Sequence, residues 1–313
     1  MDKVYQQTRQ VQPDAKAFHE NTVARLEKIR SHLDRTPRGT RLQGKVCVIT
    51  GVNSLKGIGR ASAMLYAHEG ARHLYLMDFT VDNLPELKAT IEKQYPDTKV
   101  TTLQGDAADE PTISGVCERA LKEEGRLDVF FANAGIATKD ILNDITPELF
   151  MNTMRINALS CLLAVKHASK AMLHIDAAKG KPHSSGSIIL TASTAGIRSG
   201  AGTVDYSASK AAVNSIAQTS AYQLQKTNIR VNSLCPGLIE TGMTEFTFDY
   251  ARSRGSEAKI GQLNPLGRYG VALEIAQGAC FLASDDSSYV NGQNFAIDGG
   301  LSASHPVMPG RWA

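Results

Sequence analysis

The sequence has 313 residues, of which 42% are hydrophobic and 21% charged, and a net charge of +3. This composition is typical of a soluble globular protein and excludes disordered, collagen-like and fibrous chains. No apolar run approaches the roughly 18 residues that span a bilayer. Residues 1–45 hold ten Lys/Arg against five Asp/Glu, whereas residues 46–313 hold 24 against 26. Because the bulk of the chain is slightly acidic, we expect no nucleic-acid partner. The lack of a spanning apolar run predicts no membrane association.

Cysteine usage indicates a reducing compartment. The five cysteines lie far apart with no Cys-x-x-Cys pair, and several are in apolar segments such as Val46-Cys47-Val48, where a free cysteine acts as a small hydrophobe. We therefore expect no disulfide framework and no metal site. The N-terminus also lacks the apolar region of a secretory signal, so the sequence predicts a cytoplasmic protein.

Residues 1–43 form an extension with a pattern of their own. From Asp14 to Arg35, apolar residues recur at helical spacing, and Thr36-Pro37-Arg38-Gly39 then ends the helix. These apolar residues are Phe18, Val23, Leu26, Ile29 and Leu33. Mitochondrial presequences are poor in acidic residues, whereas this stretch has four. We favour a helical extension that packs on the body or bridges subunits over a targeting segment.

From Lys45 onward, short apolar runs alternate with helical patterns. Strands are expected at residues 46–50, 73–77, 100–103, 127–131, 187–191 and 230–234. Helices are expected at residues 57–69, 84–94, 112–124, 149–171 and 206–225. Continuous apolar strands between helices imply a parallel sheet covered on both faces. The fold class is therefore α/β, a single doubly wound parallel sheet.

A glycine-rich loop joins the first strand to its helix. It reads Thr50-Gly51-Val52-Asn53-Ser54-Leu55-Lys56-Gly57-Ile58-Gly59. Glycines allow the backbone to turn sharply and approach a pyrophosphate, and the helix N-terminus offers free N–H groups. The alternative is a glycine-rich turn without a ligand, but the position between a strand and a helix is the one that the dinucleotide motif requires.

Asp78 ends the second predicted strand. A carboxylate there accepts hydrogen bonds from the adenosine ribose hydroxyls and repels a 2′-phosphate, and no Arg or Lys follows before Lys88. Lys56 argues the other way, because its ammonium could pair with a 2′-phosphate. On balance these residues favour NAD over NADP.

A tyrosine and a lysine stand one turn apart in Tyr206-Ser207-Ala208-Ser209-Lys210, at the start of a predicted helix. An ammonium beside a phenol stabilises the phenolate and lowers its pKa, so the pair can exchange a proton with a substrate oxygen. Ser193 lies thirteen residues earlier at a strand C-terminus, where ligands of open α/β sheets bind.

With these residues in place, the sequence resembles the short-chain dehydrogenase/reductase family over residues 44–300. The other matching motifs are Asp106 after the third strand, Asn133-Ala134-Gly135 after the fourth, Asn157 in the long helix, Pro236-Gly237 followed by Thr241, and Asp298-Gly299-Gly300. The resemblance implies a Rossmann fold of about seven strands, a nicotinamide cofactor and a homo-oligomer, either a dimer or a homotetramer.

The resemblance also implies the roles of individual residues. Tyr206 would be the general acid/base, Lys210 would tune it and bind the nicotinamide ribose, and Ser193 would donate to the reacting oxygen. Asn157 would hold a water in the proton relay. The glycine-loop contacts to the cofactor would be Gly51, Asn53, Lys56, Gly57, Ile58 and Gly59. The remaining contacts would be Asp78, Asp106, Ala107, Asn133, Ala134, Gly135, Pro236, Gly237, Ile239 and Thr241.

One departure from the family pattern concerns the glycine loop. Five residues separate Gly51 from Gly57, where the family usually has three, and the longer loop is similar to that of divergent enoyl-thioester reductases. Those enzymes, however, place six residues between tyrosine and lysine, whereas three separate Tyr206 from Lys210. The catalytic half therefore predicts C–OH/C=O chemistry rather than C=C reduction.

The segment at about residues 241–265 is where this family builds its substrate lid. It contains Met243, Phe246, Phe248 and Tyr250, which suit an apolar or cyclic small molecule or simply pack the lid on the body. The tail at 301–313, with Trp312, is expected to reach a neighbouring subunit.

The predicted function is NAD(H)-dependent oxidoreduction of a secondary alcohol or ketone. Two alternatives stay open. One is an NADP(H)-dependent 3-oxoacyl or enoyl thioester reductase. The other is a non-catalytic dinucleotide-sensing or scaffold protein.

Overall fold

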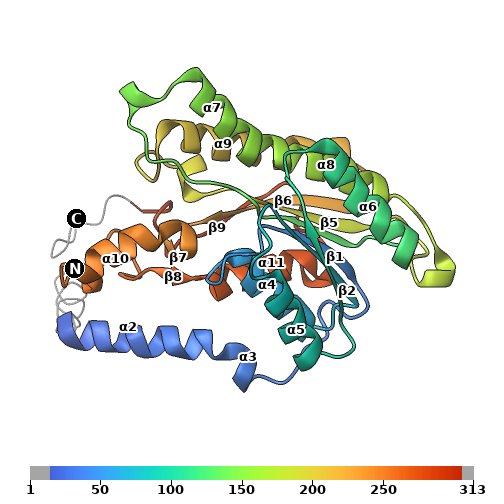
Figure 1. The fold of residues 1–313 in the computed structure, drawn as a ribbon, viewed down its shortest axis with the longest axis horizontal. Helices are drawn as coiled ribbons and strands as arrows, with labels where there is room; N and C mark the ends of the chain where they lie inside the picture. Colours follow the sequence, from blue (N-terminus) through green and yellow to red (C-terminus); the bar gives the residue numbers. More distant parts are fainter. Residues whose placement is uncertain (1–14, 305–313) are drawn as a thin grey trace, which may run out of the picture.

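Seven strands form one parallel sheet in residues 15–304, the part of the chain that the computed structural model describes (Figure 1). They are β1 (Val46–Thr50), β2 (His73–Asp78), β3 (Lys99–Gln104), β4 (Val129–Ala132), β5 (Gly186–Thr191), β6 (Ile229–Pro236) and β9 (Asn294–Ile297). Their order is β3-β2-β1-β4-β5-β6-β9, and every pairing is parallel. The predicted doubly wound sheet is confirmed. Its strand order reverses between β1 and β4, where ligands bind in folds of this kind.

Each strand supplies side chains to both faces of the sheet. In β1, Cys47 and Ile49 join the apolar cluster beneath α4 (Ile58–His68), α5 (Leu84–Gln94) and α11 (Ala272–Ala283). Val46 and Val48 join the cluster beneath α6 (Glu110–Glu124), α8 (Ser160–Met172) and α9 (Val204–Gln223). Burial on both faces explains why the central strands β1 and β4 are apolar along nearly their whole length rather than alternating.

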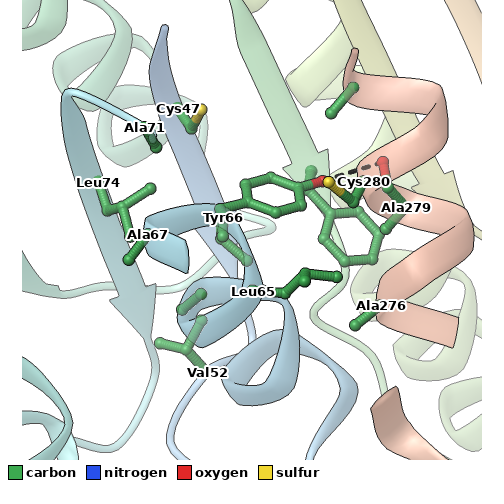
Figure 2. Close-up of a cluster of buried hydrophobic side chains, with 14 of the residues drawn as sticks. Cys47, Val52, Leu65, Tyr66, Ala67, Ala71, Leu74, Ala276, Ala279 and Cys280 are labelled. Atoms are coloured by element: carbon green, nitrogen blue, oxygen red, sulfur yellow. Dashed lines mark hydrogen bonds between the residues drawn. The ribbon is translucent and has the colours of Figure 1, made fainter. Parts of the chain in front are cut away.

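Tyr66 links two helices within the first of these clusters. Its side chain is fully buried, and its hydroxyl donates to the Ala279 carbonyl of α11 at 3.2 Å (Figure 2). Burial raises the pKa of Tyr66 well above its usual value. The hydroxyl is therefore a neutral donor that satisfies a buried carbonyl.

Capping residues explain why two helices begin earlier than predicted. The Asp109 side chain accepts from the Thr112 amide, so α6 begins at Glu110 with a proline in its first turn. The Thr146 side chain accepts from the Leu149 amide, so α7 (Pro147–Met154) also begins before the predicted start.

The fourth strand begins two residues later than predicted. The main-chain N–H of Val46 donates to the Asp128 carboxylate at 2.8 Å. Because a side chain and not a main-chain carbonyl accepts this bond, the regular strand pairing begins only after Asp128. The predicted helix at 149–171 is also interrupted. A π-helical segment, Arg155–Leu159, separates α7 from α8. Such segments are rare in proteins, and those that occur are often found at functional sites.

The chain beyond β6 contains elements that the hydropathy pattern did not predict. A two-stranded parallel sheet joins β7 (Ile239–Glu240) to β8 (Gly270–Val271), and α10 (Glu245–Ser253) lies between these strands in sequence. Helix α11 packs against both α4 and the sheet and is apolar nearly all round, which removes the helical periodicity.

The N-terminal extension includes α2 (Ala15–Arg30) and α3 (His32–Arg35). Leu26 is buried, and Ile29 and Leu33 pack against the body, whereas Phe18 and Val23 are partly exposed. Asp14 lies outside the described residues. Every helix between residues 15 and 304 is too short or too polar to span a bilayer.

Candidate active site

A cavity of about 560 Å³ opens at the C-terminal ends of β1, β2, β4 and β5. Most of the predicted site residues line it, although they come from segments far apart in sequence. Those that line it are Gly51, Gly57, Ile58, Asp78, Asp106, Ala107, Asn133, Ala134, Gly135, Ser193, Tyr206, Lys210, Pro236, Gly237, Ile239 and Thr241. Four predicted residues are not among its lining: Asn53, Lys56, Gly59 and Asn157.

Three of the four predicted catalytic residues, Ser193, Tyr206 and Lys210, converge on one end of this cavity. Helix α9 begins at Val204 and places Tyr206 and Lys210 one turn apart, and Ser193 follows the end of β5. The Lys210 ammonium lies 5.6 Å from the centre of the Tyr206 ring and donates to the Thr191 carbonyl at 2.8 Å. Lys210 is only 3% exposed, so its charge acts in a site with little competing water.

Asn157 lies behind these residues, in the π-helical segment. Its side-chain oxygen accepts from the Ile136 amide at 2.8 Å, and its nitrogen donates to the Ile136 carbonyl and the Ser209 hydroxyl. Its amide therefore fastens the loop after β4 to α9. A methyl group on Gly135 would meet the Asn157 oxygen at 3.0 Å and the Lys210 ammonium at 3.3 Å, so only glycine fits there without displacement.

Asn133 joins three strand ends beneath the cavity. Its side-chain nitrogen donates to the Thr50 and Gly51 carbonyls of the β1 end, and its oxygen accepts from the Thr191 hydroxyl of β5. Since Lys210 is bonded to the carbonyl of the same Thr191, the amide connects the glycine loop to the catalytic helix.

The glycine loop is shaped by close backbone contacts. Gly51 has a φ of +74°, which favours glycine, and a methyl group on Gly59 would lie 2.2 Å from the Gly51 carbonyl oxygen. Gly59 thus serves helix–strand packing rather than the cavity wall. The Asn53 side chain donates to the Thr80 hydroxyl at 2.7 Å and braces the loop. Lys56 reaches Glu245 of α10 at 3.4 Å.

Two carboxylates line the other end of the cavity. The Asp78 carboxylate accepts from the main-chain N–H of Asn53 at 2.8 Å and from the main-chain N–H of Thr80 at 3.2 Å. Burial raises the pKa of Asp106, but the Ala108 amide and the Arg155 guanidinium outweigh it and hold that pKa below its usual value. Arg155 pairs with Asp106 at 2.7 Å.

Sequence reasoning missed several residues that line the cavity, and most are neighbours of predicted ones. They are Thr50, Ser54, Met77, Phe79, Gly105, Ile136, Arg155, Ile156, Thr191, Ala192 and Thr244. Phe79 could have been found because it directly follows Asp78 at the C-terminal end of a strand, where ligands of such sheets bind. No local pattern points to Arg155, because the π-helical segment decides its direction.

Asp205, directly before Tyr206, lies in a buried cluster of hydroxyls. Its carboxylate accepts from Thr138 at 2.8 Å and Thr153 at 3.0 Å, which connects the loop after β4, α7 and α9. Burial raises the pKa of Asp205, but hydrogen bonds from Thr138, Thr203, Thr153 and the Tyr206 amide outweigh it and lower that pKa. The ionised form is therefore the one that holds the start of α9.

We expect Asp205→Asn to lower the free energy of unfolding at pH 7 by about 1–2 kcal/mol, because hydrogen bonds to a charged acceptor become neutral ones. A lowered folded-state pKa gives stability that is present above the unfolded pKa of about 3.9 and is lost as pH falls through the folded value. The difference from wild type in urea unfolding should therefore shrink below about pH 4. Asp144→Asn, at an exposed site, is the control. An equal difference at every pH would contradict this account.

Within residues 15–304, no three His, Cys, Asp or Glu side chains lie together in a way that could bind a metal ion. All five cysteines lie in this range, and each is free and buried. Trp312 of the predicted tail lies outside it.

Comparison with known proteins places these observations in a family context. A family model described as Enoyl-(Acyl carrier protein) reductase matches residues 51–302. Levodione reductase of Leifsonia aquatica is 36% identical over 85% of this chain and 97% of its own. A 3-oxoacyl-(acyl-carrier-protein) reductase of Thermotoga maritima is 38% identical over 83% of this chain and 99% of its own.

Solved structures match equally broadly. The crystal structure of a levodione reductase superimposes with a TM-score of 0.75 at 34% identity, covering 85% of this chain and all of the other. The structure of L-sorbose reductase from Gluconobacter frateurii, complexed with NADPH and L-sorbose, gives a TM-score of 0.75 at 27% identity, covering 86% of this chain and all of the other.

Proposed function

The chain belongs to the short-chain dehydrogenase/reductase family, and we propose that it transfers a hydride between NAD(H) and a secondary alcohol or ketone. The observation that carries the proposal is the convergence of Ser193, Tyr206 and Lys210 on one end of a cavity whose other end is lined by Asp78 and Asp106. A single cavity that is lined by these carboxylates and by the catalytic residues suits an extended dinucleotide with its reactive ring at the tyrosine.

In the proposed mechanism the cofactor supplies or accepts the hydride, and the protein handles the proton. Tyr206 exchanges the hydroxyl proton, Lys210 stabilises its phenolate, and Ser193 donates a hydrogen bond to the substrate oxygen. Asn157 fastens the loop after β4 to α9, the helix that carries Tyr206 and Lys210. Because its side-chain nitrogen already donates to two acceptors, a relay water there would have to donate to an oxygen of Asn157.

We favour NAD because of how the cations around the cavity are engaged. Arg155 is paired with Asp106, Lys210 with the Thr191 carbonyl, and Lys56 with Glu245. A 2′-phosphate beside Asp78 would be repelled by its carboxylate. Any of these three cations would have to leave its present partner to neutralise the phosphate.

The substrate is proposed to be an apolar or cyclic small molecule. Met243 lines the cavity, and Met243, Phe246 and Tyr250 of the 241–265 lid are at least half exposed. Phe248, by contrast, is fully buried and packs the lid on the body. Phe248 thus has the packing role, and the exposed Met243, Phe246 and Tyr250 are proposed to contact the substrate.

Two further properties are part of the proposal. Exposed Met151 and Leu162 border an apolar groove over α7, α8 and α9, which supports a dimer or tetramer; a one-chain mass by light scattering would refute it. The five free, buried cysteines support a reducing compartment such as the cytoplasm.

The first experiment is a fluorescence titration with NADH and, separately, NADPH, followed by a panel of secondary alcohols with NAD⁺. Tighter binding of NADH and turnover of at least one alcohol are expected. Binding without any turnover would favour a dinucleotide-sensing or scaffold protein.

A thioester reductase is the second candidate, and one observation favours it: the matching family model and the Thermotoga maritima relative both carry acyl-carrier-protein reductase descriptions. Tighter binding of NADPH, with activity on a 3-oxoacyl or enoyl thioester, would replace the first candidate by this one.

A further inference from the structure

Helix α2 lies before the matched family region, which begins at residue 51, yet it contacts the elements that carry the lid. In Figure 1 it runs alongside α10, β7 and β8, although more than 200 residues separate Arg30 from Glu240. Its position raises the question of what a helix outside the family region does next to elements that line the cavity.

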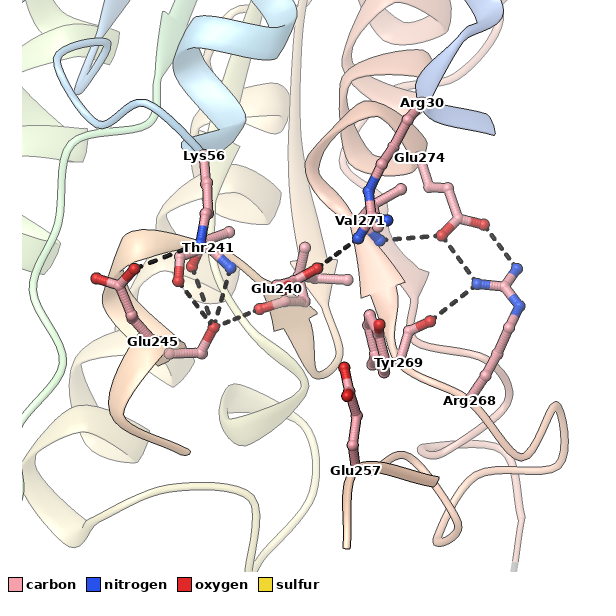
Figure 3. A network of polar contacts seen from close by, with 12 residues as sticks. Arg30, Lys56, Glu240, Thr241, Glu245, Glu257, Arg268, Tyr269, Val271 and Glu274 are labelled. Carbon is pink, nitrogen blue, oxygen red and sulfur yellow. Dashed lines mark hydrogen bonds and ion pairs between the residues drawn. The ribbon is translucent and has the colours of Figure 1, made fainter. Parts of the chain in front are cut away.

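The central contact is between Arg30 and Glu240. The guanidinium of Arg30 donates to one carboxylate oxygen of Glu240 (Figure 3). Arg252 of α10 donates to the other oxygen, and both distances are 2.5 Å. The Glu240 side chain is only 10% exposed. One carboxylate thus joins the extension, β7 and the lid helix.

Glu240 stands between two residues that line the cavity, Ile239 and Thr241. The Thr241 amide donates to the Thr244 hydroxyl at 3.0 Å, and that hydroxyl donates to the Ile239 carbonyl at 2.6 Å. Hydrogen bonds therefore fix the turn on both sides of Glu240. A displacement of Glu240 would also move Ile239 and Thr241, which line the cavity.

Apolar contacts reinforce the same connection. Leu26, which is 1% exposed, packs in a cluster with three other residues. These are Phe248 of α10, Tyr269 just before β8, and Val271 of β8. The Phe248 and Tyr269 rings meet edge to face with centres 4.8 Å apart. Helix α2 thus supplies one wall of the cluster on which the lid helix rests.

We propose that α2 is a positioning element of the active site. Through Arg30 and Leu26 it holds β7, the turn at Thr241 and α10 in the conformation that receives the cofactor. This inference rests on the proposed function for the identity of the cofactor, but the ordering of the lid by α2 does not depend on it. Without α2, part of the binding free energy is spent on ordering that segment.

The test compares Arg30→Ala with wild type by NADH titration and by hydrogen–deuterium exchange of residues 239–254 in the cofactor-free protein. We expect the Kd for NADH to rise about three- to tenfold and exchange in this segment to quicken by a similar factor, as the loss of one partly exposed charged contact implies. The urea midpoint should stay close to wild type, since the Arg30 side chain is 48% exposed.

Three further variants make the result specific. Arg25→Ala removes an exposed arginine from the same helix and should change nothing. Arg30→Lys, which keeps one charged donor, should restore most of the affinity, and Leu26→Ala should quicken exchange in the same segment. Unchanged exchange and unchanged Kd in both Arg30→Ala and Leu26→Ala would overturn the proposal.

The exchange measurement separates this inference from the proposed function. If wild type binds neither NADH nor NADPH, the proposed function fails, and faster lid exchange in Arg30→Ala still supports the role of α2. If wild type binds NADH but exchange and affinity ignore Arg30, only the role of α2 fails.

Discussion

Tyr206→Phe should lower kcat for oxidation of the best secondary alcohol by about 10³-fold, while the Kd for NADH stays within about twofold of wild type. The substitution removes only the hydroxyl, and general acid–base catalysis is worth roughly 10²–10⁴-fold. The ring and the Lys210 contact to the Thr191 carbonyl remain, so the cavity should keep its shape. Steady-state kinetics and fluorescence titration on the same preparation measure both quantities.

The matched control for this variant is Tyr222→Phe, which removes a hydroxyl from the same helix at a position that is 75% exposed. It should leave kcat unchanged. If Tyr206→Phe retained more than about a tenth of the wild-type kcat, the tyrosine would not be the proton donor. A loss of NADH binding would instead indicate that the substitution disturbs the cavity.

The fold was predictable wherever the chemistry of a segment is local. Strands buried on both faces are continuously apolar, so β1 was located to the residue and β2 to within one. The boundaries of α6 and α7 were less accurate because side-chain caps, not hydropathy, decide where they begin. Helix α11 was not predicted, since burial on most sides leaves it without an apolar stripe.

Most of the candidate site was also accessible from motifs, because the C-terminal ends of parallel strands meet at one edge. The exceptions depend on contacts between distant segments. Asn53 and Gly59 turn out to shape the loop rather than line the cavity, and Lys56 pairs with Glu245, almost 190 residues away. The bond between Arg30 and Glu240 has no local signature either, since each residue alone resembles an ordinary surface charge.

The second large effect is expected at Asp78. Asp78→Asn should change the ratio of the Kd for NADH to the Kd for NADPH by about 10²-fold in favour of NADPH. A charge-assisted hydrogen bond to the ribose is worth about 1.5–3 kcal/mol, and every 1.4 kcal/mol is tenfold in affinity. The amide oxygen of asparagine can still accept from the Asn53 main-chain N–H, the shorter of the two bonds at 2.8 Å, and only the 3.2 Å bond from the Thr80 main-chain N–H is lost. The loop should therefore keep most of its conformation. Parallel titrations with both cofactors at one ionic strength measure the ratio.

Asp82→Asn is the control, because it removes a nearby exposed carboxylate and changes the net charge equally. It should leave the ratio within about twofold of wild type, since exposed charges are largely screened. If Asp78→Asn behaved like this control, the carboxylate would not contact the ribose. Lys56→Ala would then decide between the cofactors: a selective loss of NADPH affinity in that variant would mean that Lys56 leaves Glu245 to bind a 2′-phosphate, and the preference for NAD would be wrong.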